Sequence, residues 1–208
     1  MRKIKIMFLG CGFLATHIIP HILPFSKEII LIDRERIEKV NYENCIYPKG
    51  YTGKRKVSAL TALIQILSSI PVVPIHINIK SPTSLKNLET KPDFCFVTFD
   101  NIEARLIAKE YALETGVPAL FIGVTENYIY IDWENHVELP DSPHKIEKVK
   151  KEMKRIRDIC SRLEFRGLGV LAAGYAYYAF TRWIEKGEKL AFIVSTKENI
   201  KSACLKRK

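Results

Sequence analysis

Paired cysteines and long apolar runs are both missing from this sequence. Its five cysteines include no Cys-x-x-Cys pair, so the usual ligands of a structural four-thiolate zinc site are absent and we expect no zinc. An odd cysteine count without a recognisable signal peptide argues against a disulfide framework, and we expect free thiols in the reducing cytoplasm. The most apolar stretch, 168–184, is uncharged only as far as Thr181. It is too short to span a bilayer, so no membrane association is expected.

Acidic residues are also scarce. The chain has 33 Lys and Arg residues against 23 Asp and Glu residues, a net charge of +10. Basic side chains crowd a predicted helix at 145–162 and the terminal Lys206-Arg207-Lys208. Such a surface attracts RNA, an acidic partner or an anionic substrate, but it is equally typical of the lysine-rich exterior of a thermophilic protein. Because no aromatic-interleaved motif accompanies the charge, nucleic acid is not an expected partner.

The opening segment predicts a strand, a tight turn and a helix. Ile4–Leu9 is a short apolar run of strand formers, and helical spacing of apolar residues begins at Leu14. Between them, Gly10 permits the turn and Gly12 allows backbone N–H groups to approach a phosphate. The positive end of the following helix would face that anion. The segment therefore predicts a nucleotide-binding turn.

An aspartate closes the second predicted strand. Asp33 follows the apolar run 28–32 and stands 23 positions after Gly10, about where a ribose-binding carboxylate is expected. We interpret it as a ligand of the sugar. The alternative is a strand-end aspartate that only caps a loop.

A polar loop and a lysine come next. Residues 34–53 are too polar and irregular for another regular unit, and long ordered loops usually serve a ligand. Lys56 begins the following predicted helix, where it can reach phosphates held by the glycine turn. Lys54 and Arg55 beside it leave a second interpretation open, a merely solvated lysine.

A second carboxylate follows the apolar strand 93–99. Ligands of open parallel sheets collect at the carboxyl ends of the strands, so Asp100 should face the same crevice as Gly10 and Asp33. A carboxylate there can bind Mg²⁺ through one or two oxygens while ATP supplies the rest. Helix capping is the alternative, and the two uses are compatible.

Together these motifs resemble a known family. In order and spacing they are similar to the ThiF, MoeB and ubiquitin-activating-enzyme adenylyltransferases over residues 3–132. The matching positions are Gly10-x-Gly12-x-x-Ala15, Asp33 with Glu35, Asn41, Gly53-x-x-Lys56 and Asp100-Asn101-x-x-x-Arg105.

The resemblance implies ATP-dependent adenylylation of a carboxylate, with release of pyrophosphate. It implies that Lys56 contacts the phosphates and that Asp100 binds magnesium or positions the α-phosphate. It further implies a homodimer. The implied nucleotide-binding set is Gly10, Gly12, Asp33, Asn41, Asn44, Lys56 and Asn101.

The chain also departs from the family pattern. Asn44 stands where the family usually has an arginine, and no helix precedes the first strand to supply another. The cationic contacts must then come from elsewhere, for which the sequence offers Arg34, Arg36, Lys49 and Lys54. This departure leaves a non-catalytic nucleotide-binding module open as an alternative, and a dehydrogenase remains a third.

The module that carries a thioester-forming cysteine in larger relatives is missing or reduced. Cys160 lies near the place of that cysteine, but its position on an apolar helical stripe is more typical of a packing residue. We therefore expect the activated acid to pass to a separate acyl-acceptor protein or to be released. Length and absent motifs resemble the stand-alone methanogen members that adenylylate guanylylpyridinol for the [Fe]-hydrogenase cofactor. A ubiquitin-like or sulfur-carrier protein tail is the alternative substrate.

The predicted fold is α/β, a doubly wound and mostly parallel Rossmann-like sheet of ThiF type with an antiparallel extension. We expect one domain over 1–208, with a linker near 133–144. Strands are predicted at 3–9, 28–33, 72–79, 93–99, 118–123, 128–132 and 190–195. Helices are predicted at 13–23, 54–68, 101–115, 145–162, 168–186 and 197–205.

Overall fold

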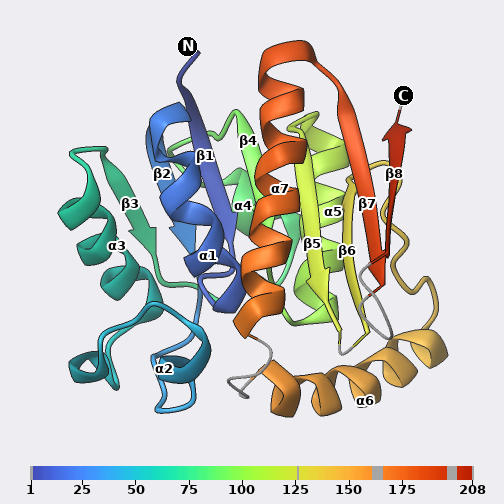
Figure 1. Ribbon diagram of the computed structural model, residues 1–208, viewed down its shortest axis with the longest axis horizontal. Helices are drawn as coiled ribbons and strands as arrows, with labels where there is room; N and C mark the ends of the chain where they lie inside the picture. Colours follow the sequence, from blue (N-terminus) through green and yellow to red (C-terminus); the bar gives the residue numbers. More distant parts are fainter. Residues whose placement is uncertain (1, 126, 161–165, 196–200, 208) are drawn as a thin grey trace.

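A single mixed sheet organises the protein. The computed structural model describes residues 2–125, 127–160, 166–195 and 201–207, with the backbone alone described at 43, 44, 152–160 and 201. Its eight strands lie in the order β3-β2-β1-β4-β5-β6-β7-β8 (Figure 1). The first five of these are parallel neighbours, and the last three continue the sheet in antiparallel fashion. The predicted doubly wound sheet with an antiparallel extension is confirmed.

The elements alternate along the parallel half. Strand order reverses between β1 and β4, which is the switch point where ligands bind in open α/β sheets. The elements of this half are β1 (Ile4–Leu9), α1 (Phe13–Ile22), a 3₁₀ turn (Leu23–Phe25), β2 (Ser26–Ile32), α2 (Asn41–Asn44), a second 3₁₀ turn (Lys49–Tyr51), α3 (Lys56–Leu67), β3 (Val72–Ile75), α4 (Pro82–Lys86), β4 (Phe94–Val97), α5 (Ile102–Thr115) and β5 (Ala119–Val124).

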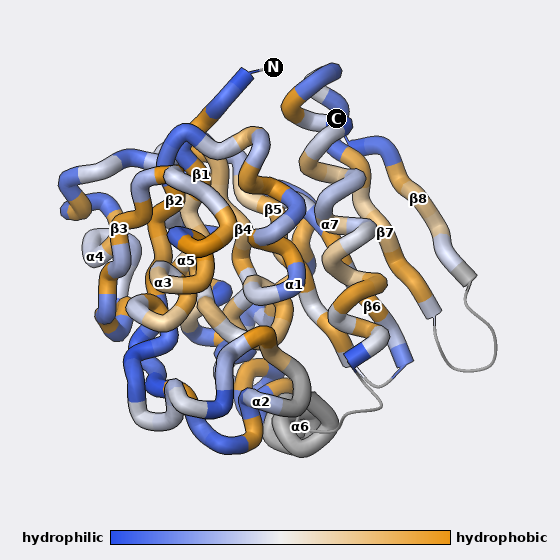
Figure 2. Tube along the Cα trace, turned by 60° about the vertical axis from the view of Figure 1, so that its left-hand side comes forward, coloured by the Kyte–Doolittle hydropathy of each residue, from blue (hydrophilic) through white to orange (hydrophobic). Residues whose placement is uncertain are grey.

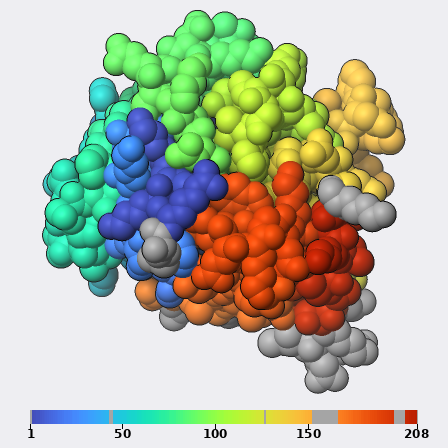
Figure 3. Space-filling model, turned by 90° about the horizontal axis from the view of Figure 1, so that it is seen from above, coloured from blue at the N-terminus to red at the C-terminus, as the bar shows by residue number. Residues whose placement is uncertain are grey.

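The second half completes the sheet and its cover. It consists of β6 (Tyr128–Trp133), α6 (Pro143–Cys160), α7 (Arg166–Lys186), β7 (Lys189–Ser195) and β8 (Lys201–Arg207). Figure 3, seen from above, shows α7 between the N-terminal segment and the C-terminal strand. In Figure 1, α2 and α6 lie at the lower edge, where the parallel strands end.

Alternation of side chains along the strands builds two cores. Ile6 and Phe8 of β1 point to a cluster that includes α1, α3 and α7. Met7 and Leu9 point to the opposite cluster, which includes α4 and α5. The central strands are therefore apolar on both faces, as expected of a parallel sheet covered by helices on both sides (Figure 2).

Two predictions about elements need correction. The predicted helix at 197–205 is wrong, because residues 201–207 form β8, paired with β7 from Lys189 to Ser195, and residues 196–200 lie outside the described part. Pairing with an exposed strand overrides the weak helical propensity of such a short segment. The strand predicted at 72–79 ends at Ile75, and its last residues form a loop that turns toward the site described below.

The expected linker near 133–144 is a packed connection between β6 and α6. Trp133 and Val137 are both buried in it. Among the described residues, no helix is long and apolar enough to cross a membrane.

Candidate active site

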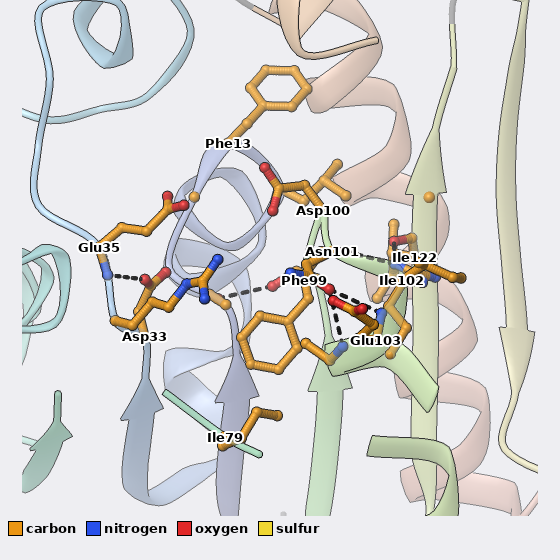
Figure 4. Close-up of a pocket in the computed structure, with 18 of the residues that line it drawn as sticks. Phe13, Asp33, Glu35, Ile79, Phe99, Asp100, Asn101, Ile102, Glu103 and Ile122 are labelled. Atoms are coloured by element: carbon orange, nitrogen blue, oxygen red, sulfur yellow. Dashed lines mark hydrogen bonds between the residues drawn. The ribbon is translucent and has the colours of Figure 1, made fainter. Parts of the chain in front are cut away.

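A cavity of about 1050 Å³ opens at the carboxyl ends of the parallel strands. It runs across the switch point, so that segments far apart in the sequence share one wall. Figure 4 shows Asp33 and Glu35 on one side of the glycine turn and Asp100 on the other. The cavity lining includes these predicted site residues: Gly10, Gly12, Asp33, Asn41, Lys56, Asp100 and Asn101. The side chain of Asn44 lies outside the described part of the chain, as does that of Cys160.

The glycine turn has two positions with different requirements. Gly10 adopts a φ of +107°, and a Cβ there would lie 2.9 Å from the backbone nitrogen of Phe99. Only glycine fits at such a backbone angle and distance. At Gly12 a Cβ would meet nothing within 4 Å, so the space above it is open. Gly12 also caps α1 without a side-chain hydrogen bond, so this open space lies beside the positive end of the helix.

Asp33 ties the turn to the end of β2. Its Oδ2 accepts a hydrogen bond of 2.7 Å from the Cys11 N–H, and its Oδ1 accepts one of 2.7 Å from the Glu35 N–H. Burial raises the pKa of Asp33, while the nearby Lys56 charge and these two bonds oppose the shift. The carboxylate thus has a structural role, and its contact with a ribose stays a prediction.

Lys56 sits in the cavity wall as part of an ion pair. Its Nζ lies 2.6 Å from Glu35 Oε2, and the residue is only 6% exposed. Burial alone lowers the pKa of Lys56, but the charges of Glu35 and Asp33 outweigh it and the pKa ends above its ordinary value. The interpretation of Lys56 as a merely solvated lysine is therefore wrong.

The polar loop 34–55 is held against the glycine turn. The Tyr47 hydroxyl donates a 2.5 Å hydrogen bond to the Cys11 carbonyl, and Asn41 Oδ1 accepts one of 2.9 Å from the Glu38 N–H. Of the four cations that the sequence offers to replace the absent arginine, Arg34 alone lines the cavity. Arg36 instead donates to the Gly53 carbonyl.

Asp100 and Asn101 divide their expected roles. Asn101 caps α5, because its Oδ1 accepts from the N–H groups of Glu103 (2.9 Å) and Ala104 (3.2 Å). The alternative interpretation of Asp100 as the cap is wrong by one residue. The exposed carboxylate of Asp100 lines the cavity instead.

A magnesium ion fits these surroundings in one way only. Among the described residues, no group of three or more His, Cys, Asp or Glu side chains is placed to hold a metal. Mg²⁺ is commonly bound through one or two carboxylates together with the phosphates of a nucleotide. Asp100 suits that arrangement, in which the ion arrives with ATP.

Sequence reasoning gave Arg105 no role of its own. It is 7% exposed, lines the cavity, and donates from Nη1 to the carbonyls of Phe99 (3.0 Å) and Ile122 (2.9 Å). Burial lowers the pKa of Arg105 to about 10, although the charges of Tyr130 and Asp100 oppose the shift. Its spacing after Asp100 was the only signal in the sequence. Ile79 and Lys80, in the loop after β3, are further cavity residues that the sequence did not reveal.

The model of the ThiF family matches residues 1–135. The chain belongs to the ThiF family. None of the curated proteins matches it.

Solved structures share the fold of this ThiF-family chain. It superposes on a crystal structure of Escherichia coli MccB with ATP with a TM-score of 0.74 at 20% identity, covering 99% of this chain and 64% of MccB. For MccB with MccA-N7isoASN the TM-score is 0.78 at 19% identity, with coverage of 98% and 64%. For PaaA it is 0.71 at 17% identity, with coverage of 97% and 72%. The chain thus spans slightly under two thirds of the length of MccB.

Proposed function

We propose that this protein adenylylates a carboxylic acid with ATP, forming an acyl-adenylate and pyrophosphate. One observation carries the proposal: the glycine turn, Lys56 and Asp100, on three separate segments, line one cavity at the switch point of the sheet. Family membership supports it. The crystal structures of MccB with ATP and with MccA also support it, although this chain covers only part of MccB.

The chemistry requires positioning more than a reactive side chain. A carboxylate oxygen of the acid attacks the α-phosphorus of ATP, a new P–O bond forms, and the bond to the β,γ-phosphates breaks as pyrophosphate leaves with its electron pair. Negative charge grows on the transferring group and on the leaving group. Preorganised N–H donors and cations stabilise that charge.

Four of the predicted residues have a role in this reaction. Gly12 and the start of α1 lie beneath the phosphates, and Asp33 holds the ribose. Lys56 leaves Glu35 to bind the phosphates. Asp100 would hold the magnesium that accompanies ATP, and the ion would supply positive charge at the phosphates. Arg34, in the cavity wall, is the one of the four cations offered by the sequence that is placed to replace the absent arginine.

The finer proposal for the acid is guanylylpyridinol, which would make this a protein like HcgE of methanogens. The absence of zinc-binding cysteine pairs from the sequence supports it. A peptide or ubiquitin-like carboxylate is the alternative, supported by the MccB structures that contain MccA. We further propose a cytoplasmic homodimer that passes its acyl group to a separate protein.

Exchange of labelled pyrophosphate into ATP tests the activity. We expect exchange that requires both magnesium and an added acid, with guanylylpyridinol more effective than simple acids or a carboxy-terminal peptide. If only a peptide supports exchange, the proposed substrate is wrong but the proposed reaction stands. Tight ATP binding without exchange for any acid would instead favour the non-catalytic nucleotide-binding module.

A further inference from the structure

Arg105 carries a buried positive charge that takes part in none of the ion pairs among the described residues. Its two hydrogen bonds both leave from Nη1 and both end on neutral carbonyl oxygens. The Asp100 charge acts on Arg105 without forming an ion pair with it, and the guanidinium carbon lies 5.6 Å from the centre of the Phe121 ring. Burying a charged group without a counter-ion is costly. A ligand that brings a negative charge would offset that cost.

The other terminal nitrogen of Arg105, Nη2, makes none of the hydrogen bonds found among the described residues and lies beside a glycine of the cavity wall. A Cβ placed on Gly123 would lie 3.9 Å from Arg105 Nη2, and Gly123 belongs to the cavity lining together with Arg105. The two bonds through Nη1 fix the plane of the guanidinium between the end of β4 and β5. A planar guanidinium held in this way presents its remaining N–H groups in one direction, as carboxylate recognition requires.

The order of the strands indicates which of the two substrates lies near Arg105. Along the sheet edge the sequence of strands is β2, β1, β4 and β5, so Asp33, the glycine turn, Asp100 and Gly123 follow one another in a row. A nucleotide that spans from Asp33 to Asp100 occupies the first three strands. The end of β5, where Nη2 lies, is left for the second substrate.

We propose that Arg105 binds the carboxylate of the acid and orients it toward the α-phosphate. This inference rests on the proposed adenylylation and adds the residue that selects an anionic group on the side of β5. Arg105 then has two functions at once. Nη1 holds the β4–α5 loop, which bears Asp100, against β5, while Nη2 holds the acid.

A pair of nucleoside probes separates the two substrate positions. 5′-O-sulfamoyladenosine occupies the nucleotide side alone, whereas 5′-O-(N-acetylsulfamoyl)adenosine adds an acyl group and a negative charge at the position of the mixed anhydride. Calorimetry gives the ratio of their affinities. We expect the wild-type protein to prefer the acylated probe by about tenfold or more, as a hydrogen bond to a charged group contributes.

Arg105→Met should abolish this preference and leave the affinity for sulfamoyladenosine unchanged within about threefold, a change smaller than one lost hydrogen bond. Lys109→Met is the matched control. Lys109 lies one turn further along α5 and donates a 2.7 Å bond to the Val137 carbonyl, but it does not line the cavity. That variant should keep the preference.

If Arg105→Met does not fold, Arg105→Lys is measured instead, because lysine keeps a charge but has no second nitrogen to point at the cavity. It should also lose the preference. A preference retained in the variant, or absent from the wild type, overturns the role of Arg105 while the adenylylation proposal stands. Failure of the wild type to bind either probe overturns the adenylylation proposal, and this inference with it.

Discussion

Lys56 Nζ and Glu35 Oε2 form a 2.6 Å ion pair in the wall of the cavity. The lysine is almost fully buried, whereas about a third of the glutamate side chain is exposed. We propose that, in the absence of a nucleotide, Glu35 holds the position beside Lys56 that a phosphate of ATP would take.

Glu35→Gln should destabilise the nucleotide-free protein by about 1–2 kcal/mol, less than the loss for a fully buried pair because Glu35 is partly exposed. The raised pKa of Lys56 means that the lysine keeps its charge across neutral pH, and its contribution to stability is lost as pH rises through that pKa. Saturating magnesium and ATP should shrink the difference, since a phosphate then pairs with Lys56. Thermal unfolding with and without ATP measures both effects.

Asp141→Asn is the control for this experiment. It removes the exposed pair between Asp141 and Lys145, in which both side chains are well exposed, and should leave the melting temperature unchanged. If ATP stabilises the wild type and the Glu35 variant equally, the exchange of Glu35 for phosphate is contradicted.

Replacing the two glycines of the turn by alanine should have different effects, on stability at Gly10 and on ATP binding at Gly12. Gly10→Ala forces a side chain into a φ of +107° and against Phe99, and should cost about 1–3 kcal/mol of folding free energy. Gly12→Ala meets no neighbour, so the protein should fold normally, yet the methyl group would occupy the space for a phosphate.

Chemical unfolding and ATP titration of the two variants check this contrast. We expect Gly12→Ala to lower ATP affinity by about tenfold or more through the loss of hydrogen bonds to a charged phosphate. Normal ATP binding by Gly12→Ala would place the phosphates elsewhere in the cavity.

Asp100→Asn removes one charge from a side chain that does not cap α5. Folding should be unaffected because Asn101 supplies the cap. Acid-dependent pyrophosphate exchange should fall by about 100-fold or more, the usual effect of losing one preorganised electrostatic contact in the transition state. Asn101→Asp, which keeps a good capping residue, is the comparison variant. Exchange within a few-fold of wild type in Asp100→Asn would refute its role in binding the metal.

The pKa of Arg105, lowered by burial to about 10, predicts a pH dependence for acid binding. An ordinary arginine keeps its proton well above that pH, whereas Arg105 should lose its charge as pH rises through about 10. Asp100 and Tyr130 are the ionisable groups whose charges act on it, and both raise its pKa. The preference for the acylated probe should therefore decline on the alkaline side of about pH 10.

The affinity for sulfamoyladenosine, measured over the same pH range, separates this effect from alkaline unfolding. A preference that stays constant through pH 11 would show that the Arg105 charge does not hold the acid.

Features formed by residues close together in the sequence could be predicted, whereas contacts between distant segments could not. The strand, glycine turn and helix at 4–22 follow from local periodicity and from glycine chemistry, and they are confirmed. Asp33 and Asp100 could be placed in one cavity because parallel strands end at the same edge of a sheet. Each of these inferences depends on the pattern of one strand and the residue that follows it.

The sequence could not predict which side chains from separate segments form ion pairs and hydrogen bonds with one another. The Lys56–Glu35 pair and the Arg105 bonds to Phe99 and Ile122 depend on how loops close, and no periodicity encodes that. Strand β8 was mistaken for a helix because its residues have little preference, and its pairing with β7 decides the outcome. Its carboxyl end is further held by Arg207, which pairs with the buried Asp132.

A crystal structure with ATP, magnesium and a non-reactive analogue of the acid tests the central claim most directly. We predict phosphates over Gly12 and the start of α1, Lys56 turned from Glu35 to a phosphate oxygen, and magnesium between Asp100 and the nucleotide. A triphosphate bound away from Gly12, with the Lys56–Glu35 pair intact and Asp100 without a metal, would contradict the account.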